Sequence, residues 1–451
     1  MDNETYIDNN KSEEPIVVET VKPSGDINNK PHEKRPLGVG IACAVAGLVI
    51  GAIGVYGLTK LLEKPPKCEE CDCPQSTSTS SDVDYSFLNL ESASDNIIYS
   101  PLSIRNGLAL LSAGASGKTK TEIDNVLGTT EITKYENIPD KLSLANAVFI
   151  RDTFKDYVLP TYTSEVQDKL GSEVFYDPFE SSASVDNWVS QKTFGLIDKV
   201  GFDPTSDLEM VLANALAIQM DWKYQFDEDD TYGRDFYKAD GSTINATTMH
   251  KETSSEDIRY YKDDNTTAIS MPLDSTSDDV NLEFVAIMPS EDIDGYIKDV
   301  NQAKVDEIIN NSTPASEPKD GVIINIPKFK YDYALKFKKD LNSLGIQTAF
   351  DKNLADFSNM ASSPLYVGEA IHKANIDFSE EGIKAAAITV FLMMDATAMT
   401  DPYVPQPVVI NIDHPFLFLV RDVDDGTVWF TGAVYQPNLW EDDAADYEAQ
   451  F

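Results

Sequence analysis

Residues 380–389 have the composition of a hinge that leads into an exposed loop able to become a β-strand. Glu380 and Glu381 precede Gly382, and mostly small side chains follow. In an extended chain, alternate side chains face opposite ways. One face of this segment then carries no charge and consists of Ile383, Ala385, Ala387 and Thr389. The opposite face consists of Lys384, Ala386, Ile388 and Val390.

The alanines of this segment are unusual for a permanent strand, which normally contains β-branched and aromatic residues. A run of alanines favours a segment that enters a sheet after the sheet has formed. Gly382 would supply backbone freedom where the movement begins. The alternative is a short amphipathic helix, because alanine and lysine are good helix formers.

A series of short motifs runs from about Val83 to about Trp440: 99–104 (YSPLSI), 143–149 (SLANAVF), 187–189 (NWV), 212–215 (LANA) with Trp222, 326–329 (IPKF), 371–374 (IHKA), the hinge, 414–418 (HPFLF) and 431–432 (TG). With these motifs in this order, the region resembles the serpin family of protease inhibitors. Their common order and spacing make the signal specific. The resemblance implies an α+β serpin fold, with a central mixed β-sheet, further sheets, surrounding helices and an exposed reactive-centre loop.

This resemblance implies an irreversible inhibitor that acts once. A serine protease, or a cysteine protease, would attack the loop and form an acyl-enzyme. The loop would then insert into the sheet and carry the protease with it. Counting fifteen residues from Gly382 places the reactive bond between Ala396 and Thr397, with Met394 and Met399 as alternative positions.

Between Lys384 and Arg421 the chain has no basic residue. The acidic pocket of a trypsin-like protease would find nothing to bind there, so elastase-like or subtilisin-like proteases are the expected targets. The alternative function is that of a non-inhibitory serpin acting as a surface binding or structural module. Ile383 stands where inhibitory members usually have Thr or Ser, and Ile388 stands where they usually have Ala.

The resemblance assigns six residues to the control of sheet opening, in the regions called the shutter and the breach: Ser100, Ser103, Asn214, Trp222, Lys328 and His372. We expect His372 to be a hydrogen-bonded core residue. Opening the sheet would break such contacts at about 0.5–1.5 kcal/mol each. Lys328 is expected to form a surface ion pair with Glu380, worth about 0–1 kcal/mol.

Catalytic and cofactor chemistry is not expected. No serine lies in a nucleophile-elbow pattern. Residues 114–119 resemble part of a phosphate-binding loop, but Ser112 replaces its first glycine, so these residues predict a turn between two helices. The chain has 76 acidic and 36 basic residues and a formal net charge of −40. This charge argues against binding to nucleic acid or anionic lipid.

The sequence before the serpin-like region suggests a membrane anchor. Residues 1–36 are polar and acidic and are expected to be disordered. Residues 37–59 are predicted as a transmembrane helix, because 37–58 contain no charge and a helix of that length would be about 33 Å long. Small residues at helical spacing could let two such helices form a dimer, and they are Gly40, Ala44, Gly47, Gly51 and Gly54.

Residues 60–82, rich in Cys, Ser and Thr, are expected to form a stalk. Cys68, Cys71 and Cys73 could form disulfides, including one between chains, or bind zinc, or remain free thiols. Lysine and arginine are balanced on the two sides of the span, so the orientation rests on function. An inhibitor of secreted proteases belongs outside, which predicts a single-pass cell-membrane protein with an extracellular domain at residues 83–440. Residues 441–451 form an acidic tail.

Overall fold

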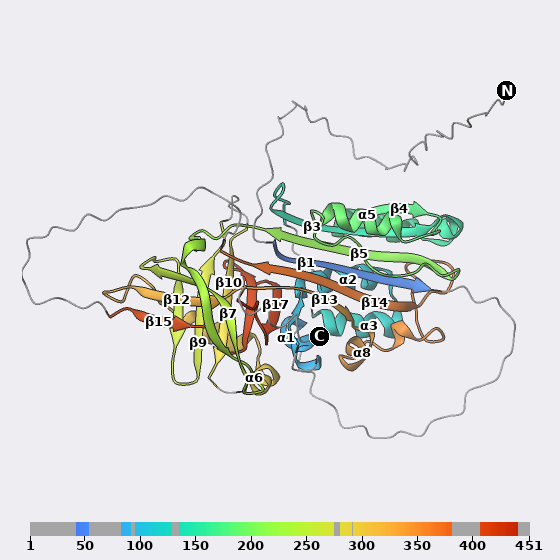
Figure 1. Ribbon diagram of the computed structural model, residues 1–451. Coiled ribbons are helices and arrows are strands. Elements are labelled where there is room, and N and C mark those ends of the chain that lie inside the picture. Colours follow the sequence, from blue (N-terminus) through green and yellow to red (C-terminus); the bar gives the residue numbers. More distant parts are fainter. Residues whose placement is uncertain are drawn as a thin grey trace, which may run out of the picture.

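The computed structural model describes residues 42–53, 83–91, 95–128, 135–274, 280–290, 292–380 and 406–440, with 42–53 described by their backbone alone. Three β-sheets and surrounding helices make up this part of the chain (Figure 1). The described helices are α1 (Val83–Leu90), α2 (Pro101–Gly114), α3 (Gly117–Leu127), α4 (Pro160–Leu170), α5 (Ala183–Lys192), α6 (Ile293–Asp299), α7 (Gln302–Asn310) and α8 (Lys338–Ser343). Short 3-10 helices lie at Asp152–Tyr157, Glu228–Asp230 and Thr348–Phe350.

Six strands form the central sheet, in the spatial order β13-β14-β1-β5-β3-β4 (Figure 1). They are Phe329–Lys336 (β13), Val367–Phe378 (β14), Ala42–Ile53 (β1), Leu208–Gln219 (β5), Leu142–Arg151 (β3) and Glu173–Asp177 (β4). β3 and β4 are parallel, and the other neighbouring strands are antiparallel. The sheet is therefore mixed, as the sequence predicted for an α+β fold.

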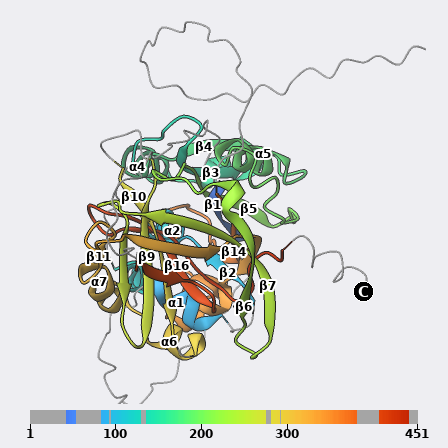
Figure 2. The same ribbon diagram turned by 60° about the vertical axis from the view of Figure 1, so that its left-hand side comes forward.

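Two further sheets lie beside the central sheet (Figure 2). One has the order β11-β8-β9-β10-β16-β17-β2, formed by Thr313–Pro314, Arg259–Lys262, Thr266–Pro272, Leu282–Pro289, Phe416–Asp422, Val428–Val434 and Ile97–Tyr99. The other has the order β15-β12-β7-β6, formed by Val408–Asn411, Val322–Pro327, Thr243–Thr253 and Thr231–Tyr237. β10, β16 and β17 are buried along their whole length, so their largely apolar sequences fit strands covered on both faces.

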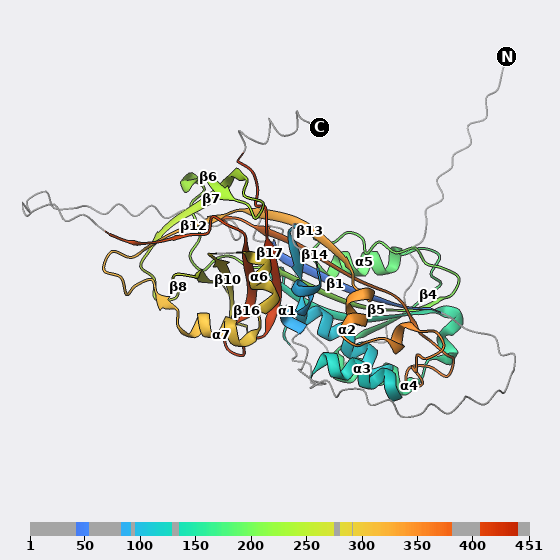
Figure 3. The ribbon, with the colours of Figure 1, turned by 90° about the horizontal axis from the view of Figure 1, so that it is seen from below.

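Helices cover both faces of the central sheet (Figure 3). Val148 and Ile150 of β3 belong to the same apolar cluster as α2 and α3, whereas Ala147 and Phe149 belong to the cluster that contains α5. Successive side chains of a strand point to opposite faces, so α2 and α5 pack on opposite sides of β3. Apolar clusters therefore cover both faces of the sheet at β3, and the same clusters include alternate residues of β5.

The start of α2 follows from its sequence. Pro101 occupies the first turn, where its missing N–H would have had no partner, and Ser100 caps the helix. The turn predicted between two helices is also present, because α2 ends at Gly114 and α3 begins at Gly117. Gly117 has a positive φ of 52°, which favours glycine.

The transmembrane helix expected over residues 37–59 is not found where the structure describes them. Ala42–Ile53 is strand β1, paired with β14 on one side and β5 on the other. No helix of the described residues is both long enough and apolar enough to cross a bilayer. An uncharged apolar run suits a membrane helix and also a strand in the middle of a covered sheet, and the sequence pattern does not separate the two.

Candidate functional site: the hinge and the central sheet

The end of β14 and the connection that follows it form the candidate site. β14 ends at Phe378, and the next described strand, β15, pairs with β12 in the four-stranded sheet. Residues 381–405 therefore connect two different sheets. The expected hinge residues Glu381, Gly382, Ile383, Ala385, Ala386, Ala387 and Thr389 lie outside the described residues. The expected reactive-bond residues also lie outside them, namely Ala396 and Thr397 with the alternatives Met394 and Met399.

Glu380, the last described residue before this connection, is fixed by three contacts. Lys328 Nζ lies 2.7 Å from Glu380 Oε2, and Thr231 Oγ1 donates a hydrogen bond of 2.6 Å to Glu380 Oε1. The Phe226 N–H donates to the Glu380 carbonyl at 3.3 Å. The expected ion pair is present, but it is not a surface pair, because Glu380 is only 3% exposed.

Trp222 supports the same end of β14. Its Nε1–H donates to the carbonyl of Ser379 at 2.9 Å, and its ring meets Phe378 edge-on with 5.3 Å between centroids. Phe378 also stacks on Phe329 of the neighbouring strand, with centroids 4.5 Å apart. These contacts fix the chain as far as Glu380.

We expect Lys328→Met to lower the free energy of unfolding by about 1–3 kcal/mol, because it leaves the buried Glu380 carboxylate without its cation. Lys328 is partly exposed, so water screens the pair and keeps the effect below that of a fully buried one. Urea denaturation followed by tryptophan fluorescence measures the change. Lys330→Met is the matched control, since Lys330 also lies 2.7 Å from a carboxylate, that of Asp377, but is exposed. The control should change by less than about 1 kcal/mol, and an equal loss in both variants would contradict the prediction.

Ser100, Ser103 and His372 meet beneath the centre of the sheet, and all three are fully buried. The Ser100 N–H donates a hydrogen bond of 3.0 Å to His372 Nε2. The Ser103 N–H donates to Ser100 Oγ, also at 3.0 Å. The structure thus brings together three of the residues that the resemblance assigned to the shutter, and it ties β14 to the start of α2.

Asn214 of β5, the fourth expected shutter residue, makes its contacts elsewhere. Its Nδ2 donates to Asn146 Oδ1 at 2.8 Å and to the Ala145 carbonyl at 3.2 Å. Asn146 Nδ2 in turn donates to Asn106 Oδ1 of α2 at 3.2 Å. The sequence analysis did not identify Asn146 or Asn106 as part of this network. For Asn146 the available signal was a single asparagine within the largely apolar run 144–150.

Strand β1 separates the two halves of this buried network. Leu48 is the register partner of His372 on β14 and of Asn214 on β5, so these two residues lie at the same level of the sheet. His372 Nδ1 and Asn214 Oδ1 are buried and have no hydrogen-bond partner within the part of the chain that the structure describes. A buried polar atom without a partner costs about 1–3 kcal/mol. The two atoms together therefore destabilise the state in which β1 lies between β5 and β14.

Burial lowers the pKa of His372 from 6.5 to about 3. The folded chain keeps the imidazole neutral where the unfolded chain binds a proton, so stability present above pH 6.5 is lost as the pH falls toward 3. A pKa difference changes the free energy of unfolding by about 1.4 kcal/mol per pH unit. Between pH 6.5 and 5, we therefore expect the free energy of unfolding of the wild type to fall by about 2 kcal/mol more than that of His372→Gln. Urea denaturation at the two pH values measures this difference. Glutamine can still accept a hydrogen bond from Ser100, and an identical pH dependence in the two chains would contradict the prediction.

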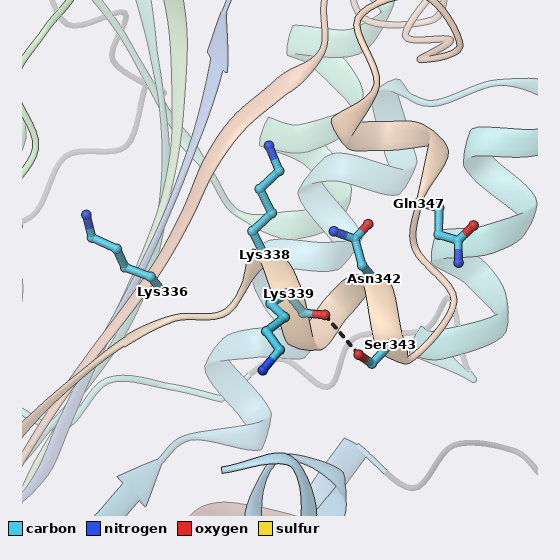
Figure 4. A pocket seen from close by; sticks show the side chains of 6 residues that line it. All are labelled: Lys336, Lys338, Lys339, Asn342, Ser343 and Gln347. Atoms are coloured by element: carbon cyan, nitrogen blue, oxygen red, sulfur yellow. Dashed lines mark hydrogen bonds between the residues drawn. The ribbon is translucent and has the colours of Figure 1, made fainter. Parts of the chain in front are cut away.

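The described residues offer no other strong site. Within them, no group of three or more His, Cys, Asp or Glu side chains could hold a metal ion. Cys68, Cys71 and Cys73 lie outside the described residues. A shallow hollow beside α8 is lined by Lys336, Lys338, Lys339, Asn342, Ser343 and Gln347 (Figure 4). Lys336 is the register partner of Ile371, in the half of β14 away from Phe378, so the hollow does not adjoin the hinge.

Comparison with known proteins gives a consistent result. The family model described as "Serpin (serine protease inhibitor)" matches residues 84–437. Serpin-Z7 of Hordeum vulgare is 29% identical over 380 residues, which cover 77% of this chain and 91% of the relative. Leukocyte elastase inhibitor of Xenopus laevis is 28% identical over 380 residues, which cover 78% of this chain and 95% of the relative.

Solved structures agree with this family. Tengpin, a thermophilic serpin, in its native state gives a TM-score of 0.65 at 26% identity, with 83% of this chain and 97% of that chain covered. Thyroxine-binding globulin in complex with thyroxine gives a TM-score of 0.64 at 22% identity, with 80% and 100% covered. The second likeness establishes the shared fold only.

Proposed function

Because the chain belongs to the serpin family, we propose that it is a single-turnover inhibitor of serine proteases with elastase-like or subtilisin-like specificity. The protease serine would attack the carbonyl of Ala396 and release the amine of Thr397, which leaves an acyl-enzyme. The freed part of the loop would then enter the central sheet with the protease attached. Insertion competes with hydrolysis of the acyl-enzyme, so it has to be the faster step.

The observation that carries this proposal is the end of β14. The chain is held there by the buried Glu380 and by Trp222, and Glu381, Gly382 and a segment rich in alanine follow in the sequence. A segment that turned back at this point would run along β14, antiparallel to it. A chain that is fixed at its base and followed by a segment with one uncharged face suits strand insertion.

Strand insertion also supplies enough free energy. A new strand that forms on the order of ten backbone hydrogen bonds, at about 1 kcal/mol each, would release on the order of 10 kcal/mol. That amount is comparable to the stability of a whole folded domain, which is about 5–15 kcal/mol. It is therefore sufficient to distort the active site of a bound protease.

The second candidate is a non-inhibitory serpin that acts as a binding or structural module. It is favoured by the bulky β-branched Ile383 at the first inward position of the hinge, because a stiff side chain there would slow insertion. Strand β1 pairs with β5 and β14 of the same chain. This pairing gives no support to the membrane span, the extracellular location or the dimer that the sequence predicted. They therefore form no part of this proposal.

The test is to mix the full chain with a panel of proteases and to look for complexes that resist SDS. We expect complexes with elastase-like or subtilisin-like enzymes and none with trypsin. A papain-like cysteine protease in the same panel shows whether the target class is wider. Cleavage of the loop without any resistant complex would favour the non-inhibitory alternative.

A further inference from the structure

Strand β1 occupies the position in the central sheet that an inserted loop would need. β14 has β13 on one edge and β1 on the other, and β5 has β3 on one edge and β1 on the other. Both edges of both strands are therefore in use. A segment that returns along β14 from residue 380 meets β1 on that edge of β14, apart from the last residues of the strand.

The direction of β1 is also that of an inserted loop. A chain that leaves β14 at Phe378 and folds back beside it must run antiparallel to β14. β1 runs antiparallel to β14 and also antiparallel to β5. The N-terminal segment thus makes the same type of backbone pairing, in the same direction, that the proposed mechanism requires of the loop.

The register shows how much of the position is filled. β1 pairs with β14 from Val367 through Asn375, which leaves Ile376, Asp377 and Phe378 as the part of that edge beyond the pairing. On the other side, β1 pairs with β5 from Leu208 to Gln219, along the whole of that strand. An entering loop could begin beside the last three residues of β14 but could not continue.

We propose that Ala42–Ile53 is an internal strand ligand of the central sheet, and that a protease can be trapped only after this segment has left the position between β5 and β14. The second half of this inference rests on the inhibitory function proposed above. The sequence of the segment suits the position, because Ala42–Ile53 contains no charged residue and apolar clusters cover both faces of the neighbouring strand β5.

The buried polar atoms on either side of β1 indicate that the segment can leave. His372 contacts Ser100, the cap of α2, while Asn214 connects through Asn146 to Asn106 of α2. Both side chains therefore lie on the α2 side of the sheet, level with Leu48. If β1 leaves, β5 and β14 can close together, and His372 Nδ1 and Asn214 Oδ1, which lack partners within the described part of the chain, can pair. The new pairing between β5 and β14 would thus offset part of the free energy lost when β1 gives up its backbone hydrogen bonds.

A disulfide tests both halves of the inference in the full chain. Cys43 is the register partner of Ile218 on β5. Directly opposite residues of antiparallel strands have Cα atoms about 4.5–5.5 Å apart, within the range of about 4.4–6.8 Å for a disulfide. We expect Ile218→Cys to form a bond to Cys43 on mild oxidation, identified by mass spectrometry of the linked peptides. The control is the same variant carrying Cys43→Ser, which should form no such bond.

The same variant is then mixed with a cysteine-free subtilisin, which reductant does not affect. We expect the oxidised chain to form at least tenfold less SDS-resistant complex than the reduced chain, and dithiothreitol to restore the complex. The Cys43→Ser control should trap equally with and without oxidation. Equal trapping by the crosslinked and reduced chains would overturn the requirement that β1 must leave.

A second variant loosens β1 instead of fixing it. Leu48→Pro removes a backbone donor from the middle of the strand, so we expect several-fold less inhibitor to be consumed per trapped protease and a lower midpoint of thermal unfolding. Leu48→Val keeps the donor and serves as the control.

Two outcomes separate the position of β1 from the proposed inhibitory function. If oxidised Ile218→Cys shows no disulfide to Cys43 and Leu48→Pro leaves the unfolding midpoint unchanged, the position of β1 is overturned and the helical span for 37–59 is favoured. A disulfide that forms while no variant traps any protease would support that position and reject the proposed inhibitory function.

Discussion

Ala396→Arg should turn the chain into a trypsin inhibitor. We expect trypsin not to cleave the wild-type chain between Ala385 and Val420 and not to be trapped by it. The wild-type sequence has no basic residue between Lys384 and Arg421, so trypsin has no side chain to bind there. An arginine at the acyl-donor position can pair with the pocket carboxylate of trypsin, and the rest of the loop is unchanged. We expect the rate of complex formation with trypsin to rise by at least 100-fold and the rate with elastase-like enzymes to fall.

Ala396→Gln is the control, because it adds a long polar side chain without a charge. It should not form complexes with trypsin. Mass spectrometry of the released C-terminal fragment locates the bond in the wild-type chain, and we expect the fragment to begin at Thr397. A fragment beginning at Asp395 or Thr400 would move the acyl donor to Met394 or Met399. No cleavage between Ala385 and Val420 by any protease of the panel would contradict the proposed function.

Ile383→Arg should convert the inhibitor into a substrate. In the proposed insertion, residue 383 would take the first inward position of the hinge, so its side chain would have to lose its water as the strand enters the sheet. Burying an unpaired guanidinium is strongly unfavourable, and hydrolysis of the acyl-enzyme should then overtake insertion. We expect at least tenfold more inhibitor to be cleaved per protease trapped, measured from the ratio of cleaved chain to SDS-resistant complex.

Two controls separate insertion from other effects of that change. Lys384→Arg places the same group one residue further on, at a position that faces the other way, and it should trap as the wild type does. Ile383→Thr introduces a residue usual in inhibitory members of the family and should trap at least as well as the wild type. Undiminished trapping by Ile383→Arg would show that this hinge does not enter the sheet.

Much of the fold could be predicted because local sequence determines it. The Ser100 cap and Pro101 specify the start of α2, and the glycines at 114 and 117 mark the turn into α3. The apolar run 416–420 belongs to strand β16, which is buried along its whole length, as an uninterrupted apolar run allows. The resemblance to a family supplied the pairing of Lys328 with Glu380, since a contact between residues so far apart in the chain has no local signal.

The burial of that pair and the asparagine network depend on tertiary structure. Glu380 is buried because Lys328, Thr231 and the backbone of Phe226 converge on it from three separate segments. Asn146 of β3 becomes part of the network because its side chain bonds both to Asn214 of β5 and to Asn106 of α2. Neither arrangement can be read from a window of sequence, because each needs the final positions of distant strands.

By itself, the sequence determined that residues 42–53 must be withdrawn from water, since they form an uncharged apolar run. It did not determine where they go. A bilayer would satisfy the backbone within a helix, whereas a sheet satisfies it through neighbouring strands, and both environments accept the same side chains. Only the tertiary structure places these residues in the sheet. β5 and β14 are far apart in the chain, and the fold brings an edge of each to the two sides of the segment.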